Sequence, residues 1–328
     1  MRSMRLILWL VLVLGVLWGG YWFVGARAVE AGAATWFADQ KAAGLVADNK
    51  GLAVAGFADR FDLTVTDPHL ADPVSGWGWQ APFAQIFAMT WKPWHLIAAL
   101  PNAQEVDLPD GQKLTVGSAR MMASLMMRPS LDLPFDRAVM EAEGLTLTSD
   151  AGWQVGADKV VLAAQDDATR ANTLRLGADV TQLQVPAALA HIADLGPTVA
   201  AMHLDVSAAM SAPLGNSLLG KTVVGVTVTS VQVVWGAMEL TATGSVKPDA
   251  TGLAEGKIDL ALKGWRSLPA LVVALGLVPP QNQVTVQRGL EFLAKSGSDP
   301  DALSLPLTFA GGYMSLGPLP LGPAPRLH

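Results

Sequence analysis

The chain has 328 residues, of which 51% are hydrophobic and only 15% are charged. Soluble domains carry roughly 25% charged residues, so this chain either buries a large apolar surface or presents one to an apolar partner. The net charge of −6 and the scattered basic residues exclude the basic stripe that nucleic-acid binding requires. The absence of cysteine excludes disulfides, thiolate metal ligands and cysteine nucleophiles.

The N-terminal segment is the clearest single feature of the sequence. No charged residue lies from Leu6 to Ala26, between Arg5 and Arg27. As a helix this segment rises roughly 30 Å, which matches the hydrocarbon thickness of a bilayer. The basic residues before it predict that the N-terminus stays in the cytoplasm and that the body lies in the periplasm. We therefore expect residues 1–27 to be a cytoplasmic stub and a transmembrane signal-anchor helix in a bacterial inner membrane.

A cleaved signal peptide is the alternative interpretation of the same segment. The sequence Ala26-Arg27-Ala28 has the small residues of a cleavage site, and cleavage after Ala28 would leave the body soluble in the periplasm. The apolar run is longer than the roughly 7–15 residues of a usual signal peptide. The uncleaved anchor is therefore the favoured interpretation.

After the anchor the sequence changes from helical to strand periodicity. Residues 28–50 are expected to form a membrane-proximal helix, ended by Gly44, and a connector. From residue 60 to 66 polar and apolar residues alternate strictly. This alternation predicts a strand with Phe61 and Leu63 on one face.

Residues 51–328 are predicted to form one extracytoplasmic β-rich domain. Further strands are expected where the strand pattern recurs, at residues 52–55, 106–108, 113–116, 174–180, 202–206, 223–235, 238–246, 258–262, 303–309 and 313–316. Helices are expected only at residues 186–195, 267–275 and 281–294. The pattern predicts an all-β to α+β fold, in which a transmembrane helix precedes a curved, mostly antiparallel sheet with a few short helices. A polar turn at residues 165–170 marks a weak subdivision.

The sequence lacks the motifs of nucleophilic, phosphate-binding and metal-dependent enzymes. His203 and Asp205 share one strand face, where they form either half of an acid–base dyad or, as we prefer, part of a polar strand face. Glu141 and Glu143 are interpreted in the same way, as solvated charges. We therefore expect no catalytic residue, no cofactor and no metal site, and a protein that is not an enzyme. An envelope hydrolase is a further alternative, because distant polar residues can meet in a fold.

An aromatic stretch is the most unusual local feature of the body. It comprises Trp77, Trp79, Phe83, Phe87, Trp91 and Trp94. Tryptophan combines a large apolar surface with one N–H donor, so the stretch is a candidate wall for an apolar ligand or a contact surface for the membrane. Packing in a core or at a sheet edge is the more frequent role of such residues.

Five segments carry a distinctive combination of residues. They are GFADRFDL at 56–63, TDP at 66–68, GWGWQAPF at 76–83, WKPWH at 91–95 and LGPLPLGPAP at 316–325. Through these segments the chain resembles the alphaproteobacterial envelope proteins of domain-of-unknown-function family 2125, from about residue 28 to the C-terminus. The segments contain no catalytic signature. Ala58 stands where the family is expected to have proline, which bears on the rigidity of that turn.

More distantly, the anchor helix followed by long amphipathic strands is similar to AsmA-like envelope proteins, mainly from Trp235 onward. That resemblance implies curved sheets, apolar grooves and a role in envelope lipid homeostasis. We expect a non-enzymatic protein that is anchored in the inner membrane and holds lipid acyl chains. The second hypothesis is an assembly or scaffold factor that binds another envelope protein through a sheet edge or the aromatic stretch.

Overall fold

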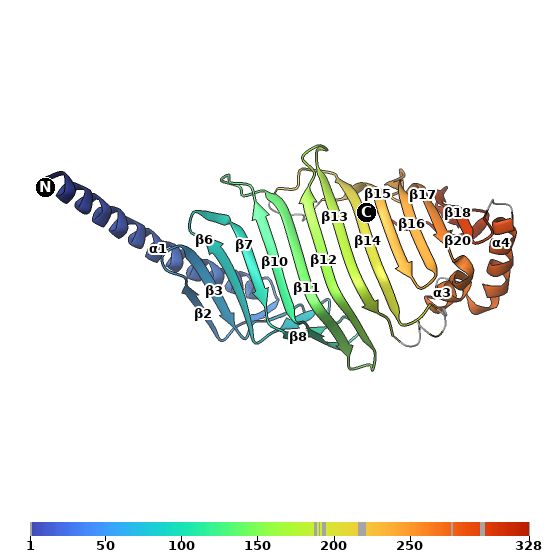
Figure 1. The fold of residues 1–328 in the computed structure, drawn as a ribbon, viewed down its shortest axis with the longest axis horizontal. Coiled ribbons are helices and arrows are strands. Elements are labelled where there is room, and N and C mark those ends of the chain that lie inside the picture. Colours follow the sequence, from blue (N-terminus) through green and yellow to red (C-terminus); the bar gives the residue numbers. More distant parts are fainter. Residues whose placement is uncertain are drawn as a thin grey trace. The chain divides into compact units, whose positions relative to one another are not determined.

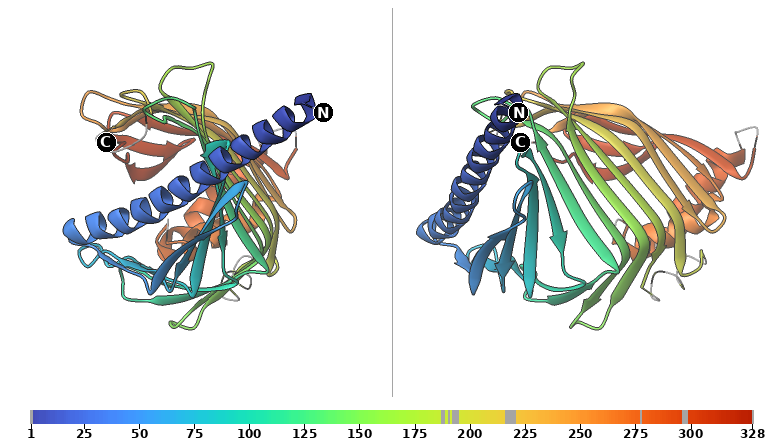
Figure 2. Two further views of the ribbon diagram at one scale, coloured as in Figure 1. Left: turned by 90° about the vertical axis from the view of Figure 1, so that its left-hand side faces the viewer. Right: turned by 60° about the vertical axis from the view of Figure 1, so that its left-hand side comes forward.

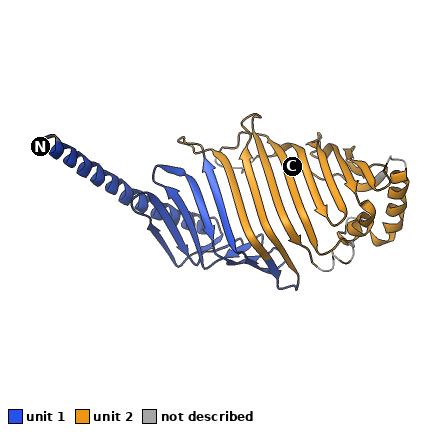
Figure 3. Cartoon of the chain, viewed as in Figure 1, with its two compact units in different colours: residues 1–127, 147–152 blue, residues 128–146, 153–328 orange. Residues whose placement is uncertain are grey.

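The computed structural model describes residues 2–186, 189, 191, 195–215, 221–276, 278–295 and 299–327. The chain forms two compact units: unit 1 comprises residues 1–127 and 147–152, and unit 2 comprises residues 128–146 and 153–328 (Figure 3). Strands account for about 52% of the chain and helices for about 22%. The predicted fold class is confirmed: a long apolar helix precedes a mostly antiparallel sheet body with a few short helices (Figure 1).

Helix α1 is one unbroken element, Arg2–Ala42 (Figure 1). It is long and apolar enough to span a membrane, with its apolar window near the N-terminus. All its side chains from Met4 to Trp18 are exposed. The helix also includes most of residues 28–45, which the sequence assigns to a membrane-proximal helix, and Gly44 follows its end with a φ of 91°. Glycine accommodates this left-handed conformation without strain, so Gly44 ends the helix as predicted.

From Gly19 onward one side of α1 packs against the body of unit 1. Trp22, Ala26 and Phe37 are buried at the spacing of one helix face. They contact apolar residues of the neighbouring strands in two core clusters. The helix therefore changes along its length from exposed on all sides to half covered by protein.

Two groups of antiparallel strands complete unit 1. The first group has the order β2–β3–β6–β7–β10, with β2 Gly51–Ala55, β3 Arg60–Thr66, β6 Phe83–Met89, β7 Lys92–Leu100 and β10 Arg120–Met127. The second group has the order β1–β4–β5–β8–β9, with β1 Val46–Asp48, β4 His69–Ala71, β5 Gly78–Gln80, β8 Ala103–Asp107 and β9 Lys113–Gly117. Helix α1 packs against β1, β2 and β3.

The alternation in β3 determines which side of the first group faces α1. Phe61, Leu63 and Val65 are buried, whereas Arg60 and Thr66 at the ends of the strand are exposed. Each buried side chain of this size contributes roughly 1.5–3 kcal/mol relative to exposure in water. The predicted strand face is therefore the face that binds the helix.

Unit 2 is a meander in which each strand pairs with the next strand along the chain. Its strands are β11 Phe135–Ser149, of which the last residues belong to unit 1, β12 Gln154–Asp166, β13 Thr173–Gln184, β14 Thr198–Met210, β15 Val223–Trp235, β16 Met238–Pro248, β17 Ala254–Lys263, β18 Ala302–Ala310, β19 Tyr313–Leu316 and β20 Leu319–Pro323. The pairings from β12 to β20 are antiparallel. Figure 2 shows β12 to β17 side by side and curved along their length.

Short helices follow β17 in unit 2. They are η1 Trp265–Ser267, α3 Leu268–Ala274, η2 Pro280–Asn282 and α4 Gln283–Lys295. Gly276 follows α3 with a φ of 71°, as expected for a helix end. Ser267 precedes α3 without a capping hydrogen bond from its side chain, because η1 leads directly into the helix.

Several strands have no counterpart among the expected strands. Strands β6, β7 and β10 are not predicted, because apolar residues occupy both of their faces and no period of two is visible. The long strands β11 and β12 and the short strands β1, β4, β5 and β20 also lie outside the ranges expected to form strands. The polar turn at 165–170 lies within unit 2, where it joins the paired strands β12 and β13. The helix expected at 186–195 falls largely on residues outside the described part of the chain.

Candidate functional site

An open apolar pocket in unit 1 is the candidate site, because its lining is the most apolar among the pockets of the described residues. Its volume is about 400 Å³, and its lining is almost entirely apolar. Three tryptophans contribute to the lining: Trp36 from α1, Trp79 from β5, and Trp77 just before that strand. Ligand pockets of proteins occupy roughly 300–1,000 Å³ and are lined mainly by apolar and aromatic side chains. The pocket therefore has the size and chemistry of a site for an apolar ligand.

The register of the second strand group builds the floor of this pocket. Ala47 pairs with Leu70, Leu70 with Trp79, and Trp79 with Val106. Directly paired residues project to the same face of a sheet, so these four side chains form one apolar row across β1, β4, β5 and β8. All four line the pocket.

A hydrogen bond holds the indole of Trp79 in place. Its Nε1–H donates to Oε1 of Gln104 over 2.9 Å. Gln104 is buried, and its amide nitrogen in turn lies 3.3 Å from the carbonyl oxygen of Pro101. The polar atom of the tryptophan is therefore satisfied away from the pocket, which leaves the ring as an apolar wall.

The turn before β5 carries a fixed negative charge beside the pocket. Hydrogen bonds from the Ser75 hydroxyl and from the Val74 N–H hold the pKa of the Asp72 carboxyl below its ordinary value. The Val74 N–H lies 2.9 Å from Oδ1 of Asp72. Asp72 is itself a lining residue, so one charge marks an otherwise apolar site.

The structure divides the aromatic stretch between the two strand groups of unit 1. Trp77 and Trp79 line the pocket, whereas Phe83, Phe87, Trp91 and Trp94 lie on β6, on β7 or in the turn between these strands. Phe83 and Trp91 are exposed, and Phe87 and Trp94 are half-buried. The stretch is therefore continuous in sequence but does not form one surface.

The contribution of α1 to the pocket was not predicted from the sequence. Trp36 and Gln40 are lining residues from the last turns of this helix. One sequence feature pointed to it: Trp36 lies next to the apolar face of the helix that continues from the N-terminal apolar run. That β1 of the second strand group packs against this helix is visible only in the structure.

Unit 2 presents a second apolar surface, the inner face of its meander. Leu162, Ala178 and Leu204 are cross-strand partners on β12, β13 and β14, and similar apolar pairs continue through β18. Helix α4 covers this face near β17 and β18. Leu162 and Leu176 remain 43% and 36% exposed. The inner face is thus only partly covered.

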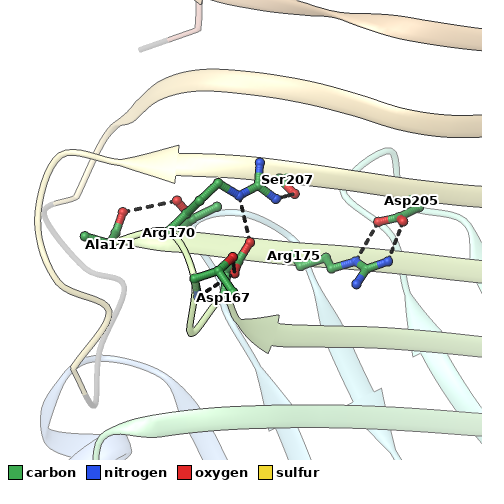
Figure 4. Close-up of polar contacts among 8 residues, drawn as sticks. Asp167, Arg170, Ala171, Arg175, Asp205 and Ser207 are labelled. Atoms are coloured by element: carbon green, nitrogen blue, oxygen red, sulfur yellow. Dashed lines mark hydrogen bonds and ion pairs between the residues drawn. The ribbon is translucent and has the colours of Figure 1, made fainter.

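The opposite face of the meander is polar and carries cross-strand ion pairs (Figure 4). Arg175 binds Asp205 through two hydrogen bonds of 2.9 and 2.6 Å, which hold the pKa of this carboxyl below its ordinary value. Arg170 contacts Asp167 and Ser207 over 2.8 Å each. The Arg175–Asp205 pair joins neighbouring strands and stabilises their pairing, whereas the Arg170 contacts hold the turn between β12 and β13 against β14.

The structure assigns other partners to the polar residues weighed as catalytic. Nδ1 of His203 lies 2.7 Å from Asp179 on the neighbouring strand, whereas Asp205 binds Arg175. Glu141 pairs with Lys159 over 2.8 Å. Among the described residues, no group of three or more His, Asp and Glu side chains could hold a metal ion.

One serine–histidine contact occurs in unit 1. Nε2 of His95 on β7 lies 3.0 Å from Oγ of Ser124 on β10, and both side chains are partly buried. Ser124 is in the middle of its strand, directly paired with Ile97. The contact is not predictable from the sequence, because the two residues are 29 positions apart and nothing in the sequence shows that β7 and β10 are neighbours.

Comparison with known proteins gives a family but no characterised relative. A family model described as "Uncharacterized protein conserved in bacteria (DUF2125)" matches residues 22–325. No curated protein and no solved structure matches the chain. The more distant AsmA-like resemblance stays a prediction. The match covers both units and the second half of α1, so the chain belongs to the DUF2125 family of bacterial proteins.

Proposed function

We propose that this protein is a non-enzymatic, membrane-anchored protein of the bacterial envelope that holds a lipid acyl chain in the apolar pocket of unit 1. The observation that carries the proposal is the pocket of about 400 Å³ with its three tryptophans. An acyl chain suits this site because each methylene group removed from water contributes about 0.8 kcal/mol and needs no polar partner. The basic residues before the apolar segment support a periplasmic location of the body.

The packing of α1 supports an anchor that stays attached to the body. Trp22 and Ala26 are buried against unit 1. The indole N–H of Trp22 donates to the carbonyl oxygen of Arg60 over 2.7 Å. Cleavage after Ala28 would remove these contacts and expose Phe61. An intact mass measured on protein extracted from membranes should therefore include the N-terminal segment.

The test of lipid binding is gentle extraction of the full chain, gel filtration and mass spectrometry of the lipid that remains bound. We expect stoichiometric lipid in the native protein and a clear loss in Trp77→Ala, which removes one wall of the pocket. Phe83→Ala is the matched control, because this aromatic residue belongs to the same stretch but does not line the pocket. It should retain the lipid.

Two outcomes would redirect the proposal. If Leu176→Ser loses the lipid and Trp77→Ala keeps it, the binding site is the inner face of unit 2. If the native protein is lipid-free, stable and monodisperse, lipid binding is wrong. The assembly-factor hypothesis would then take its place, and cross-linking in intact cells should capture one dominant protein partner.

The contact between His95 and Ser124 favours one second candidate, an envelope hydrolase. A serine nucleophile needs a neighbouring base and also donors that stabilise the oxyanion. The base is present, but the backbone N–H groups around Ser124 belong to a paired strand, which disfavours an oxyanion hole there. Labelling with a fluorophosphonate probe decides between the two: labelling that disappears in Ser124→Ala would support the hydrolase.

A further inference from the structure

The body of unit 1 contacts α1 within the segment that would span the membrane. A bilayer core of about 30 Å requires about 20 helical residues, so a span that begins at Leu6 extends to about Gly25. Contacts with the body begin well before that point, at Trp18 and Gly19. The segment from Leu6 to Leu17 rises only about 18 Å and is too short to cross the core alone.

Three hydrogen bonds attach the spanning segment to two turns of unit 1. Trp18 Nε1–H donates to the carbonyl oxygen of Ala58 over 2.8 Å, in the turn between β2 and β3. Tyr21 donates through its hydroxyl to the carbonyl oxygen of Thr90 over 2.8 Å, in the turn between β6 and β7. Together with the bond from Trp22 to Arg60, these contacts fix both turns beside residues 18–22.

The two turns expose apolar side chains at this level. Phe57 is 62% exposed and Trp91 is 57% exposed, and Met89 next to them is 40% exposed. Phe57 also packs against Trp22 and Phe23 of α1, with ring centroids 5.4 and 5.8 Å apart. Aromatic residues of this kind are enriched where a protein meets the membrane–water interface.

We propose that the turns between β2 and β3 and between β6 and β7 are seated in the bilayer leaflet nearest the body, with Phe57 and Trp91 in contact with phospholipid. The inference rests on the membrane anchor of the proposed function but is independent of the pocket. Asp59 and Arg60 beside the first turn are exposed, so their charged groups stay hydrated by extending toward the headgroups while the apolar side chains contact lipid. The body thus sits partly in the leaflet instead of above it.

The absence of cysteine from the chain makes a direct test simple. Single substitutions Phe57→Cys and Trp91→Cys are spin-labelled in the full chain, which is reconstituted in vesicles of phosphatidylethanolamine and phosphatidylglycerol. Collision of the label with oxygen, which concentrates in lipid, is compared with collision with a water-soluble nickel chelate. Met89→Cys provides a third position at the same level, in case one of the other variants does not fold.

Two control positions define the scale. Val13→Cys reports the spanning part of α1, and Val74→Cys reports a 97% exposed position in the turn next to Trp77. Asp72, in the same turn as Val74, lines the pocket together with Trp36 of α1, so this turn lies near Trp36. Trp36 is roughly 27 Å from Trp18 along the helix axis, and the Val74 label is therefore expected far from lipid.

We expect labels at 57, 91 and 89 to favour oxygen at least severalfold more than the label at 74. If they collide with nickel as freely as the label at 74 while the label at 13 is protected, the seating of the turns is wrong and the anchor stands. If the label at 13 is also accessible to nickel, the membrane anchor itself is wrong and the inference fails with it.

Discussion

Units 1 and 2 both present an apolar sheet face, and they cover that face in different ways. In unit 1 the cover is α1, a helix that precedes the strands in the sequence and packs on β1, β2 and β3. In unit 2 short elements that follow the strands provide the cover, with α4 on β17 and β18. Leu162 and Leu176 on β12 and β13 stay exposed beyond these covers. The same strand pattern thus gives an open, tryptophan-lined pocket beside the covering helix in one unit and a partly covered face in the other.

The largest expected effect concerns the cover of unit 2. Leu290 on α4 is fully buried against Leu303 and Leu305. Replacement of a buried leucine by alanine removes methyl groups and leaves a cavity, which costs about 3 kcal/mol in free energy of unfolding. Leu290→Ala should therefore lower the urea midpoint of the full chain in detergent micelles.

Val284 on the same helix provides the control, since its side chain is 57% exposed. Val284→Ala should change the free energy of unfolding by less than about 0.5 kcal/mol. Equal effects of the two substitutions would mean that α4 does not cover the apolar face, and the contrast between the units would lose its basis.

An intermediate effect is expected at the cover of unit 1. A Cβ atom on Gly25 would lie 2.5 Å from Cζ of Phe61, so a larger side chain must displace this buried ring. Gly25→Leu should destabilise the packing of α1 by about 1–3 kcal/mol, the usual cost of overpacking. Thermal unfolding followed by tryptophan fluorescence measures the change.

Gly20→Leu is the matched substitution, because nothing lies within 4 Å of a Cβ atom at that position. Both substitutions increase helix propensity to the same extent, so the difference between them isolates the clash with Phe61. If the two variants have the same stability, α1 does not pack on β3 at this level.

The smallest expected effect is a pH dependence on the polar face of unit 2. The pKa of the Asp205 carboxyl is lowered mainly by its hydrogen bond from Arg175, relative to an ordinary value of 3.8. A carboxyl with a lowered folded-state pKa stabilises the fold above its ordinary pKa, and this contribution is lost as the pH falls through the folded-state value. Asp205→Asn should therefore cost about 0.5 kcal/mol at pH 7, typical of an exposed ion pair.

The cost of Asp205→Asn should decrease as the pH falls below the ordinary value of 3.8, where the unfolded-state carboxyl becomes protonated, and it should vanish below the lowered folded-state pKa. Asp259→Asn, at a more exposed pair with Lys257, is the comparison, and it should cost less at pH 7. A cost that is constant from pH 7 to pH 3 would show that the side chain acts through shape and not through charge. Urea unfolding at several pH values provides the measurement.

The sequence determined the long apolar N-terminal helix and many of the amphipathic strands. The uncharged run to Ala26 predicts a spanning helix because a bilayer excludes charge, and β15 extends from Val223 to Trp235 in both prediction and structure. Strand alternation also predicts correctly that Phe61 and Leu63 avoid water. Periodicity is a local property, so it can be read from the chain without knowledge of its neighbours.

Only the tertiary structure decided what covers the apolar faces and which distant residues meet. Trp36 and Trp79 line one pocket although 42 positions of sequence separate them, because β1 packs against α1 and the register of four strands aligns the apolar row. The residues of the aromatic stretch are divided between two strand groups because strand pairing places β5 in one group and β6 and β7 in the other. Which element covers a face depends on long-range packing, and an apolar pattern has the same appearance whether protein or lipid is its partner.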